Sequence, residues 1–471
     1  MKRLILVIAL ASAGFTARAQ IASEGQSILI RPEQNLTVAE AGWRSRSEDD
    51  ALLPAEGRGL SQGEFRAVAA HSLDSLRRVE GRVSYERGVK RGVCWNTSSD
   101  WELLAPYVTV DSVGGDLQKE QYRFYARYAS HAGKRLTYSL FTDYRALHEY
   151  RQVDPRPRNI TADLLLGASG GVLAGDYAFT LEGAWRVYHQ SGDVSFSNPL
   201  GMNTAIIHDL GFGRSFTRFS GSSSSMNARF RGGGLTASLT MEPLGHIGWI
   251  AGADYSYTDI VRHLKAQNET PLSELRLHRL EGYAGHKWQA ALVRARAAAS
   301  LKRGLENVVD QTSAFGTAAT LPLYRQHAIE ASLDAIVERP LWTVHPSLGF
   351  SGISASDLYP GSSFRASFAK AGADVSLRLG KTLSISAGAE GRLVFADDFL
   401  LASAPDERTT AYLEHLAQRV SDSRIGGYLS AEASFATRDR MRLFVRPLVG
   451  GTYYFTDHYR LDIQIFTGIQ F

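Results

Sequence analysis

The chain has 471 residues, with 52 Lys and Arg against 48 Asp and Glu, a formal net charge of +4 and a single cysteine, Cys94. One cysteine excludes an intramolecular disulfide and a cysteine-cluster metal site. Basic and acidic residues are interspersed, without the clustered basic stripe of a nucleic-acid-binding protein. The composition therefore predicts no nucleic-acid partner, and nothing in it calls for a cofactor or a metal.

The first 19 residues have the pattern of a signal peptide. Lys2 and Arg3 form a positive start, residues 4–10 form an apolar run, and Ala17-Arg18-Ala19 is a small-x-small cleavage site. The apolar run is shorter than the roughly 20 residues that a membrane-spanning helix requires. We therefore expect an exported protein whose mature chain begins at Gln20.

Residues 20–79 show no clean alternation of apolar and polar positions. Residues 61–64, Ser-Gln-Gly-Glu, fit a helix capping box ahead of the apolar residues 65–69, so a short helix is one interpretation. An irregular segment in the periplasm or in the lumen of a barrel is the other. The sequence leaves both open and places the start of the following domain at about residue 80.

From Gly81 onward the chain repeats a long alternating segment, a turn and another alternating segment. A period of two predicts β-strands, because successive side chains leave opposite faces. Many segments run to about fifteen residues, beyond the five or six usual in soluble sheets and long enough for tilted membrane strands. After a first strand at 82–85, the clearest segments are 122–128, 136–145, 177–187, 249–257, 329–335, 371–379, 383–395, 425–435 and 441–455.

The last twelve residues alternate as well and end on the aromatic Phe471. A terminal strand of this kind resembles the closing strand of bacterial outer-membrane barrels, in which the final aromatic is read by the barrel-assembly machinery. An edge strand of a soluble β-sandwich is the alternative, which the export signal and the preceding strands disfavour. We expect this strand to close a ring by pairing with residues 82–85, and Phe471 to be the assembly signal.

The connections alternate in length. Short ones are expected near Gly133, Gly221, Gly245, Pro340 and Gly380 and near Asp439, and longer ones near 88–118, 150–159, 189–204, 304–324, 354–362 and 398–422. This asymmetry is typical of outer-membrane barrels, whose long loops lie outside the cell. The sequence thus predicts an all-β protein of the Gram-negative outer membrane, in contact with its lipid: a transmembrane antiparallel up-and-down β-barrel of about 16–18 strands spanning residues 80–471.

Charged residues on the strands are expected to face the lumen, because a Lys or Arg facing lipid at mid-membrane costs about 2–4 kcal/mol. The lumen is then either a water-filled pore or an interior cross-linked by ion pairs, and residues 20–79 could plug it. The predicted lumen-lining charges are Asp143, Arg145, Glu182, Arg186, Glu390, Arg392, Glu432, Arg442 and Arg446.

No catalytic or metal-binding motif stands out. The serine run at 222–225 lies at an expected turn and lacks an activating base. His189, His208, His263 and His278 match no metal-ligand spacing. We expect no enzymatic activity, and a barrel-embedded hydrolase is only a remote alternative.

Two loops differ from the rest in composition. The first, near 93–116, carries Trp95 and Asp100; the second, at 154–159, contains two prolines whose fixed φ angles make it stiff. Stiffness would hold the arginines of the second loop for an acidic ligand, or for pairing with Asp100, Glu102 or Asp116 of the first. The predicted extracellular site residues are Trp95, Asp100, Asp154, Arg156, Arg158 and Asn159.

The same stretches carry a family resemblance. The Cys-Trp-Asn-x-x-Ser-Asp run at 94–100, Gly-Gly-Asp-Leu at 114–117 and Asp-Pro-Arg-Pro-Arg-Asn at 154–159 resemble an outer-membrane β-barrel family of unknown function from the Bacteroidota. The resemblance covers about residue 80 to the end. It implies a barrel often encoded near TonB-dependent uptake systems. The leading hypothesis is a channel or uptake component for a small solute; the alternative is a non-conducting structural or accessory barrel that binds a partner through its extracellular loops.

Overall fold

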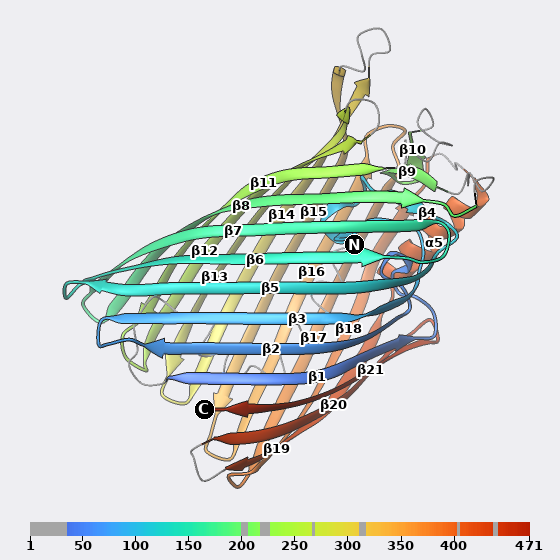
Figure 1. Cartoon of the computed structure of the whole chain (residues 1–471). Helices are drawn as coiled ribbons and strands as arrows, with labels where there is room; N and C mark the ends of the chain where they lie inside the picture. Colours follow the sequence, from blue (N-terminus) through green and yellow to red (C-terminus); the bar gives the residue numbers. More distant parts are fainter. Residues whose placement is uncertain are drawn as a thin grey trace.

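Eighteen long strands form one closed antiparallel sheet in the computed structural model (Figure 1). The structure describes residues 35–198, 206–216, 227–265, 269–309, 317–402, 406–436 and 441–471. Each long strand pairs with the next long strand along the chain, and the last, β21, pairs with the first, β1. The fold is an up-and-down barrel at the upper end of the predicted strand number.

The wall strands are long, with most of them between 13 and 19 residues. They are β1 (Leu36–Glu48), β2 (Gly59–Ser72), β3 (Arg77–Val93), β5 (Gly115–Ala132), β6 (Leu136–Tyr150), β7 (Arg156–Ala174), β8 (Tyr177–Ser195), β11 (Ala228–Pro243), β12 (Gly248–Leu264), β13 (Pro271–Trp288), β14 (Ala291–Val309), β15 (Thr317–Glu338), β16 (Trp342–Asp357), β17 (Ser363–Leu379), β18 (Leu383–Leu400), β19 (Arg424–Ala436), β20 (Arg442–Tyr454) and β21 (His458–Gln470).

Shorter elements occupy the connections at one end of the barrel. They are η1 (Pro54–Glu56), α3 (Trp101–Leu104), β4 (Thr109–Asp111), β9 (Ile206–Gly211), β10 (Arg214–Ser215) and α5 (Glu407–Val420). Among the described residues, no helix is long and apolar enough to cross a membrane.

The alternation predicted from sequence sorts residues onto two faces of the wall. On β8, Leu181 and Trp185 are 62% and 56% exposed on the outside, whereas Ala184 and Tyr188 are buried on the inside. Equivalent outward apolar rows recur around the ring. A closed ring pairs every strand edge and presents an apolar band, which is the arrangement that hydrocarbon tolerates. The prediction of a transmembrane β-barrel is confirmed.

The predicted start of the barrel and its closing pair are wrong. β1 and β2 are wall strands, so the wall begins at Leu36, and residues 61–64 lie within β2 rather than at the start of a helix. β21 pairs with β1, from Val38 opposite Gln470 to Glu48 opposite Arg460, not with residues 82–85. The predicted signal peptide lies outside the described residues.

The physical reason lies in the outer faces of these two strands. Trp43 and Phe65 are their large exposed apolar side chains, and small residues such as Ala41 and Ala67 fill most of the remaining outward positions. Small side chains give little contrast between the two faces, so the period of two is weak in the sequence.

The connections alternate in length as expected. Gly133, Gly245, Pro340 and Gly380 lie in short turns at one end of the barrel, and the longer connections lie at the other. The chain end also lies at the short-turn end, where the Phe471 N–H donates to the Thr37 carbonyl at 2.8 Å. The turns predicted near residues 221 and 439 lie outside the described residues.

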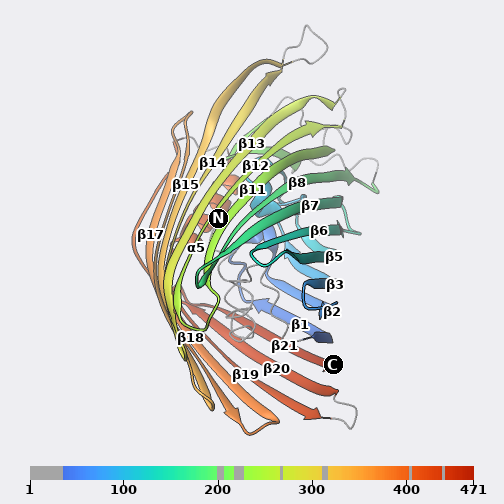
Figure 2. The ribbon, with the colours of Figure 1, turned by 90° about the vertical axis from the view of Figure 1, so that its left-hand side faces the viewer.

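The main core of the molecule lies inside the barrel, towards the end that carries the long loops. Trp101, Leu104 and Val108 from the connection after β3 are buried there against Tyr188 and Phe230 of the wall. Figure 2 shows α5 inside the ring of strands, and Figure 1 shows it at the same end as β4, β9 and β10. The lumen at this end therefore contains packed protein.

Candidate functional site

The connection between β3 and β5, residues 94–114, folds into the barrel and is called here the inner loop. Two ion pairs hold it to the wall near β6 and β7. Asp100 accepts from both terminal nitrogens of Arg145, at 2.8 and 2.5 Å, and Arg151 donates to Asp111 at 2.6 Å. The side chains of Arg151 and Asp111 are 1% and 0% exposed. Separating this pair would leave a buried charge without a partner.

Further polar contacts attach the inner loop to the same region. The Asn159 side-chain amide donates to the Thr97 carbonyl at 2.7 Å, and the Ser99 hydroxyl donates to Glu149 at 2.6 Å. Glu149 also pairs with Lys90 at 3.0 Å. Together with the two ion pairs, these contacts form a cluster, called here the polar clamp.

The inner loop then reaches a different part of the wall. The Lys302 ammonium, on β14, donates to the Ala105 carbonyl at 2.6 Å, and the Tyr107 hydroxyl donates to Glu306 of the same strand at 3.1 Å. The inner loop is thus attached to β6 and β7 at one side and to β14 at another. It crosses the lumen between them.

A second insert, residues 206–216, packs on the inner loop. Its strand β9 pairs with β4, with Thr109 opposite His208. Arg262 of β12 donates to the Thr109 hydroxyl at 2.9 Å, and Arg214 forms ion pairs with Glu306 on β14 and Asp357 on β16. This insert therefore links the inner loop to the wall on the side of β12–β16.

Helix α5 is the third insert and belongs to the connection between β18 and β19. Asp406 caps its start by accepting from the Thr409 N–H at 2.9 Å. The Tyr412 ring stacks on Trp95 of the inner loop, with centroids 4.7 Å apart and 15° between the planes. Near its other end, Arg392 of β18 donates to the carbonyls of Val420 and Asp422.

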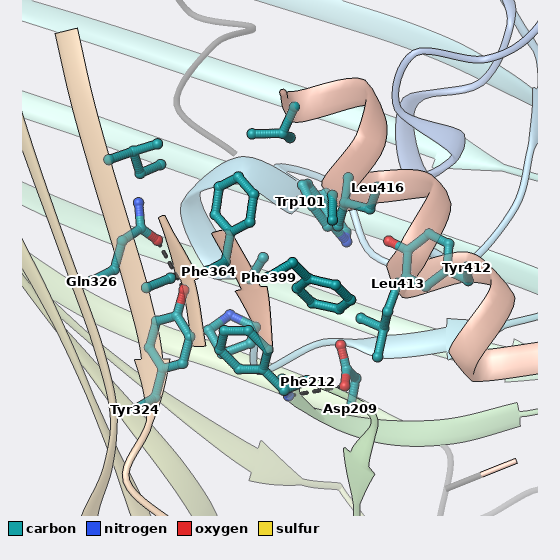
Figure 3. Close-up of a pocket in the computed structure, with 17 residues that line it drawn as sticks. Trp101, Asp209, Phe212, Tyr324, Gln326, Phe364, Phe399, Tyr412, Leu413 and Leu416 are labelled. Atoms are coloured by element: carbon teal, nitrogen blue, oxygen red, sulfur yellow. Dashed lines mark hydrogen bonds between the residues drawn. The ribbon is translucent and has the colours of Figure 1, made fainter. Parts of the chain in front are cut away.

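A pocket lies between these inserts and the wall strands β15–β18 (Figure 3). It holds about 700 Å³ of space free of protein atoms, including solvent at its open side. Its lining is mainly aromatic and aliphatic, as is usual for small-molecule sites. The aromatic lining residues are Trp101, Phe212, Tyr324, Phe364, Phe399 and Tyr412.

Few polar groups reach this pocket. The Tyr324 hydroxyl donates to the carbonyl oxygen of the Gln326 side chain at 2.9 Å, so these two groups are already paired. The Asp209 carboxyl lies between Phe212 and Leu413 (Figure 3) and accepts from the Gly211 N–H at 2.9 Å. Burial raises the pKa of Asp209 to about 7, although Arg262 opposes this shift. Near neutral pH this carboxyl is therefore partly protonated. The protonated form can donate a hydrogen bond, whereas the ionised form can only accept one.

A protein-family model, "Family of unknown function (DUF6850)", matches residues 27–471. The chain belongs to this family. The match includes β1 and β2, in agreement with a barrel that begins before residue 80. No curated protein matches the sequence significantly.

Solved structures that resemble this DUF6850 chain include a transporter, an uptake receptor and a channel. The outer membrane transporter YddB from Escherichia coli is 8% identical, with 93% of this chain and 80% of that chain covered and a TM-score of 0.41. The ferric yersiniabactin uptake receptor FyuA from Yersinia pestis is 11% identical, with 92% and 80% covered and a TM-score of 0.43. The CymD monoaromatic hydrocarbon channel is 9% identical, with 95% and 92% covered and a TM-score of 0.33.

The nine predicted lumen charges of the DUF6850 chain lie on the inward face of their strands. None of them lines the pocket. Arg392 holds the end of α5, and Glu390 lies two residues from it on the same face. The ion pairs of the others are Arg145 with Asp100, Arg186 with Asp163, Asp143 with Arg123, Glu182 with Arg127, and Glu432 with both Arg442 and Arg446.

The predicted loop residues separate into two groups. Trp95, Asp100 and Asn159 meet at the inner loop, as described above. Asp154 and Arg156 instead pair with each other at 2.8 Å, and Arg158 is exposed.

The predicted pairing of Arg156 or Arg158 with Asp100, Glu102 or Asp116 is wrong. Asn159 faces inward, so the arginines one and three positions before it face outward, away from the inner loop. Asp116 accepts instead from the Gly92 N–H at 2.9 Å.

Sequence reasoning missed the pocket residues, although two signals were present. Residues 413, 416, 417 and 420 have the i, i+3, i+4, i+7 spacing of an amphipathic helix, and all four line the pocket. Phe212, with a φ of 51°, lies between two glycines that also have positive φ and form the turn between β9 and β10. Both signals fall in connections, where strand alternation carries no information.

Among the described residues, the histidines belong to no cluster that could hold a metal ion. His208 is buried against Arg262. In the part of the chain that the structure describes, no group of three or more His, Cys, Asp or Glu side chains is placed to hold a metal ion. The serine run at 222–225 lies outside that part.

Proposed function

We propose that this DUF6850 protein is an outer-membrane uptake component that binds a small, mainly apolar solute in the pocket beside α5. The pocket itself carries the proposal: an aromatic-lined space with one buried titratable carboxyl, Asp209, lies at the long-loop end of the lumen. The long loops of such barrels face the outside of the cell, so the pocket is on the side from which a nutrient arrives.

The occupied lumen supports selective uptake over free diffusion. An 18-stranded barrel without inserts is wide enough for an aqueous channel. Here the inner loop, residues 206–216 and α5 fill the long-loop end. A solute that passes must first bind, and an insert must then move. α5 is the insert that covers the pocket mainly through apolar side chains such as Leu413 and Leu416.

The lining also restricts the chemistry of the solute. Aromatic side chains favour flat or branched apolar groups, and each buried polar group needs a partner. Asp209 would be the hydrogen-bond partner of a single hydroxyl or amine group on the ligand. A strongly anionic solute is disfavoured, because burial already makes charge at this position costly.

Binding can be tested with 1-naphthylamine, a small fluorescent aromatic amine, and purified protein in detergent. Ala355, a buried wall residue that lines the pocket, would be changed in A355W to fill the space. The matched control is A297W, on the exposed outer face of β14. We expect A355W, but not A297W, to lose 1-naphthylamine binding and to show slower uptake of this probe into liposomes. Equal binding by wild type and A355W would overturn the proposal.

A second candidate function is a non-conducting accessory barrel that binds a partner, such as a TonB-dependent uptake system, through its outer loops. The buried Asp111–Arg151 pair favours it, because that pair resists opening of the lumen. Planar-bilayer recordings and liposome flux separate the two functions. Absence of both conductance and flux, with a co-purifying partner lost on replacing Arg156 and Arg158 by alanine, would support the accessory role.

We also propose that Phe471 is the signal for the barrel-assembly machinery. It is 57% exposed and ends the strand that closes the ring. Deletion of Phe471 is expected to lower the amount of barrel inserted in the outer membrane. Undiminished insertion of the deletion variant would contradict this role.

A further inference from the structure

Three arginines lie side by side on the outer face of the barrel. Arg276 of β13 is directly opposite Arg303 of β14, and Arg303 is directly opposite Arg325 of β15. All three are exposed. Their neighbours one position away, such as Lys302 and Gln326, are buried on the inner face, so the row points towards the membrane side.

Two members of this row have no neutralising partner among the described residues. Arg276 pairs with Glu274 and lies opposite Asp259. Arg303 and Arg325 form no ion pair or hydrogen bond with any other residue that the structure describes. Like charges directly opposite each other across two strands destabilise a sheet. An anion bound between Arg303 and Arg325 would remove this repulsion.

The row lies at the height of lipid headgroups. Arg303 is ten residues beyond Val293, an exposed apolar residue near the short-turn end of β14. At about 3.3 Å per residue this is about 33 Å along the strand, and a typical tilt of about 40° leaves about 25 Å along the membrane normal. That height equals the apolar band of such barrels, so the arginines are at its outer edge.

The neighbouring strands add hydroxyl groups and a further arginine. Ser356 of β16 lies opposite Arg325, and Ser354 lies opposite Arg365 of β17. Arg365 in turn has Asp398 opposite it on β18. Carboxylates therefore lie at the two ends of the arginine row, beside Arg276 and Arg365, and not at its centre. On the short-turn side of the arginine row, Ile329 is 55% exposed and belongs to the apolar band.

We propose that Arg303 and Arg325 bind the phosphate group of a phosphorylated lipid in the leaflet that faces the long loops. Guanidinium groups match phosphate oxygens with paired hydrogen bonds, and the serine hydroxyls can donate further ones. The lipid is favoured over a soluble phosphate because its acyl chains would lie along Ile329 and the apolar band. The proposal rests on the outer-membrane placement given above but not on the solute pocket.

Native mass spectrometry of delipidated full-length protein in detergent tests this site. Diphosphorylated lipid A, its dephosphorylated counterpart and inorganic phosphate are the three probes. The test variant is R303Q/R325Q. The control is R231Q, an exposed arginine of β11 that faces outward and already pairs with Glu269 at 3.1 Å.

We expect the double variant to lose about tenfold or more in affinity for the diphosphorylated lipid. R231Q should bind it as the wild type does, and the dephosphorylated lipid should bind all variants weakly. An unchanged circular dichroism spectrum of the double variant would show that its fold is intact. This control does not involve the solute pocket, so the result is independent of the proposed uptake function.

Three outcomes would overturn the proposal. One is equal lipid affinity of wild type and R303Q/R325Q. Another is binding of inorganic phosphate as tight as that of the lipid, which would indicate a site for a soluble anion. The third is loss of a co-purifying acidic protein without any change in lipid binding, which would assign the arginine row to a protein partner.

Discussion

The inner loop meets the barrel wall in two regions that differ in chemistry. Near β6 and β7 it is held by the polar clamp, in which Arg151 and Asp111 are fully buried. Beside β15–β18, α5 and the inserts leave an apolar pocket. Buried ion pairs are directional and costly to separate, whereas apolar contacts are non-directional and can re-form around a ligand. The polar clamp is therefore expected to keep the inner loop fixed to the wall, whereas the inserts beside the pocket can move.

Breaking the clamp should have the largest effect. R151M leaves Asp111 buried and unpaired, and we expect it to lower the free energy of unfolding by about 3–5 kcal/mol. It should also raise conductance in planar bilayers, because the inner loop loses one of its attachments to the wall. Denaturant unfolding in detergent measures the first effect.

R77M is the control for this prediction. Arg77 pairs with Asp74 in an exposed short turn, and its loss should leave stability nearly unchanged. Equal stability of the two variants would show that the polar clamp does not anchor the inner loop.

The two regions should also respond oppositely to pH. Burial raises the pKa of Asp209 to about 7, so its favourable contribution is complete below about pH 4 and is lost as the pH rises through 7. Burial alone would also raise the pKa of Asp100, but hydrogen bonds and the charge of Arg145 lower it. The contribution of Asp100 is therefore present above about pH 4 and lost only as the pH falls further.

We therefore expect stability to fall between pH 5 and pH 8, by an amount on the order of 3 kcal/mol for Asp209. Thermal unfolding at several pH values measures this, and D209N should have a flatter profile. Burial and nearby Glu56 raise the pKa of Glu102 to about 7. Glu102 therefore adds a change in stability of the same sign. An unchanged profile in a D209N/E102Q variant would contradict the assignment.

The smallest expected effect concerns the contact between the two regions. Trp95 of the inner loop stacks on Tyr412 of α5. A double-mutant cycle with W95L and Y412L should give a coupling free energy of about 0.5–1.5 kcal/mol. Y412L alone should speed 1-naphthylamine exchange by loosening α5. A coupling near zero would mean that α5 is held independently of the inner loop.

Most of the wall could be predicted from sequence. The predicted strands at 122–128 and 177–187 lie within β5 and β8, and their large apolar side chains, such as Phe124 and Trp185, are exposed on the outer face. The prediction failed at β1 and β2, where alanines and serines on the outer face weaken the alternation. For the site, Trp95, Asp100 and Asn159 were singled out, but as parts of an exposed surface.

The sequence by itself determined that this chain alternates with a period of two and turns at regular intervals, because those properties depend on neighbouring residues. Only the tertiary structure decided that the inner loop folds into the lumen, and that Asp111 meets Arg151 and Tyr107 meets Glu306. These partners are 40 and 199 residues apart. Their meeting depends on the closure of the ring, which brings distant strands around one interior and leaves the pocket beside α5.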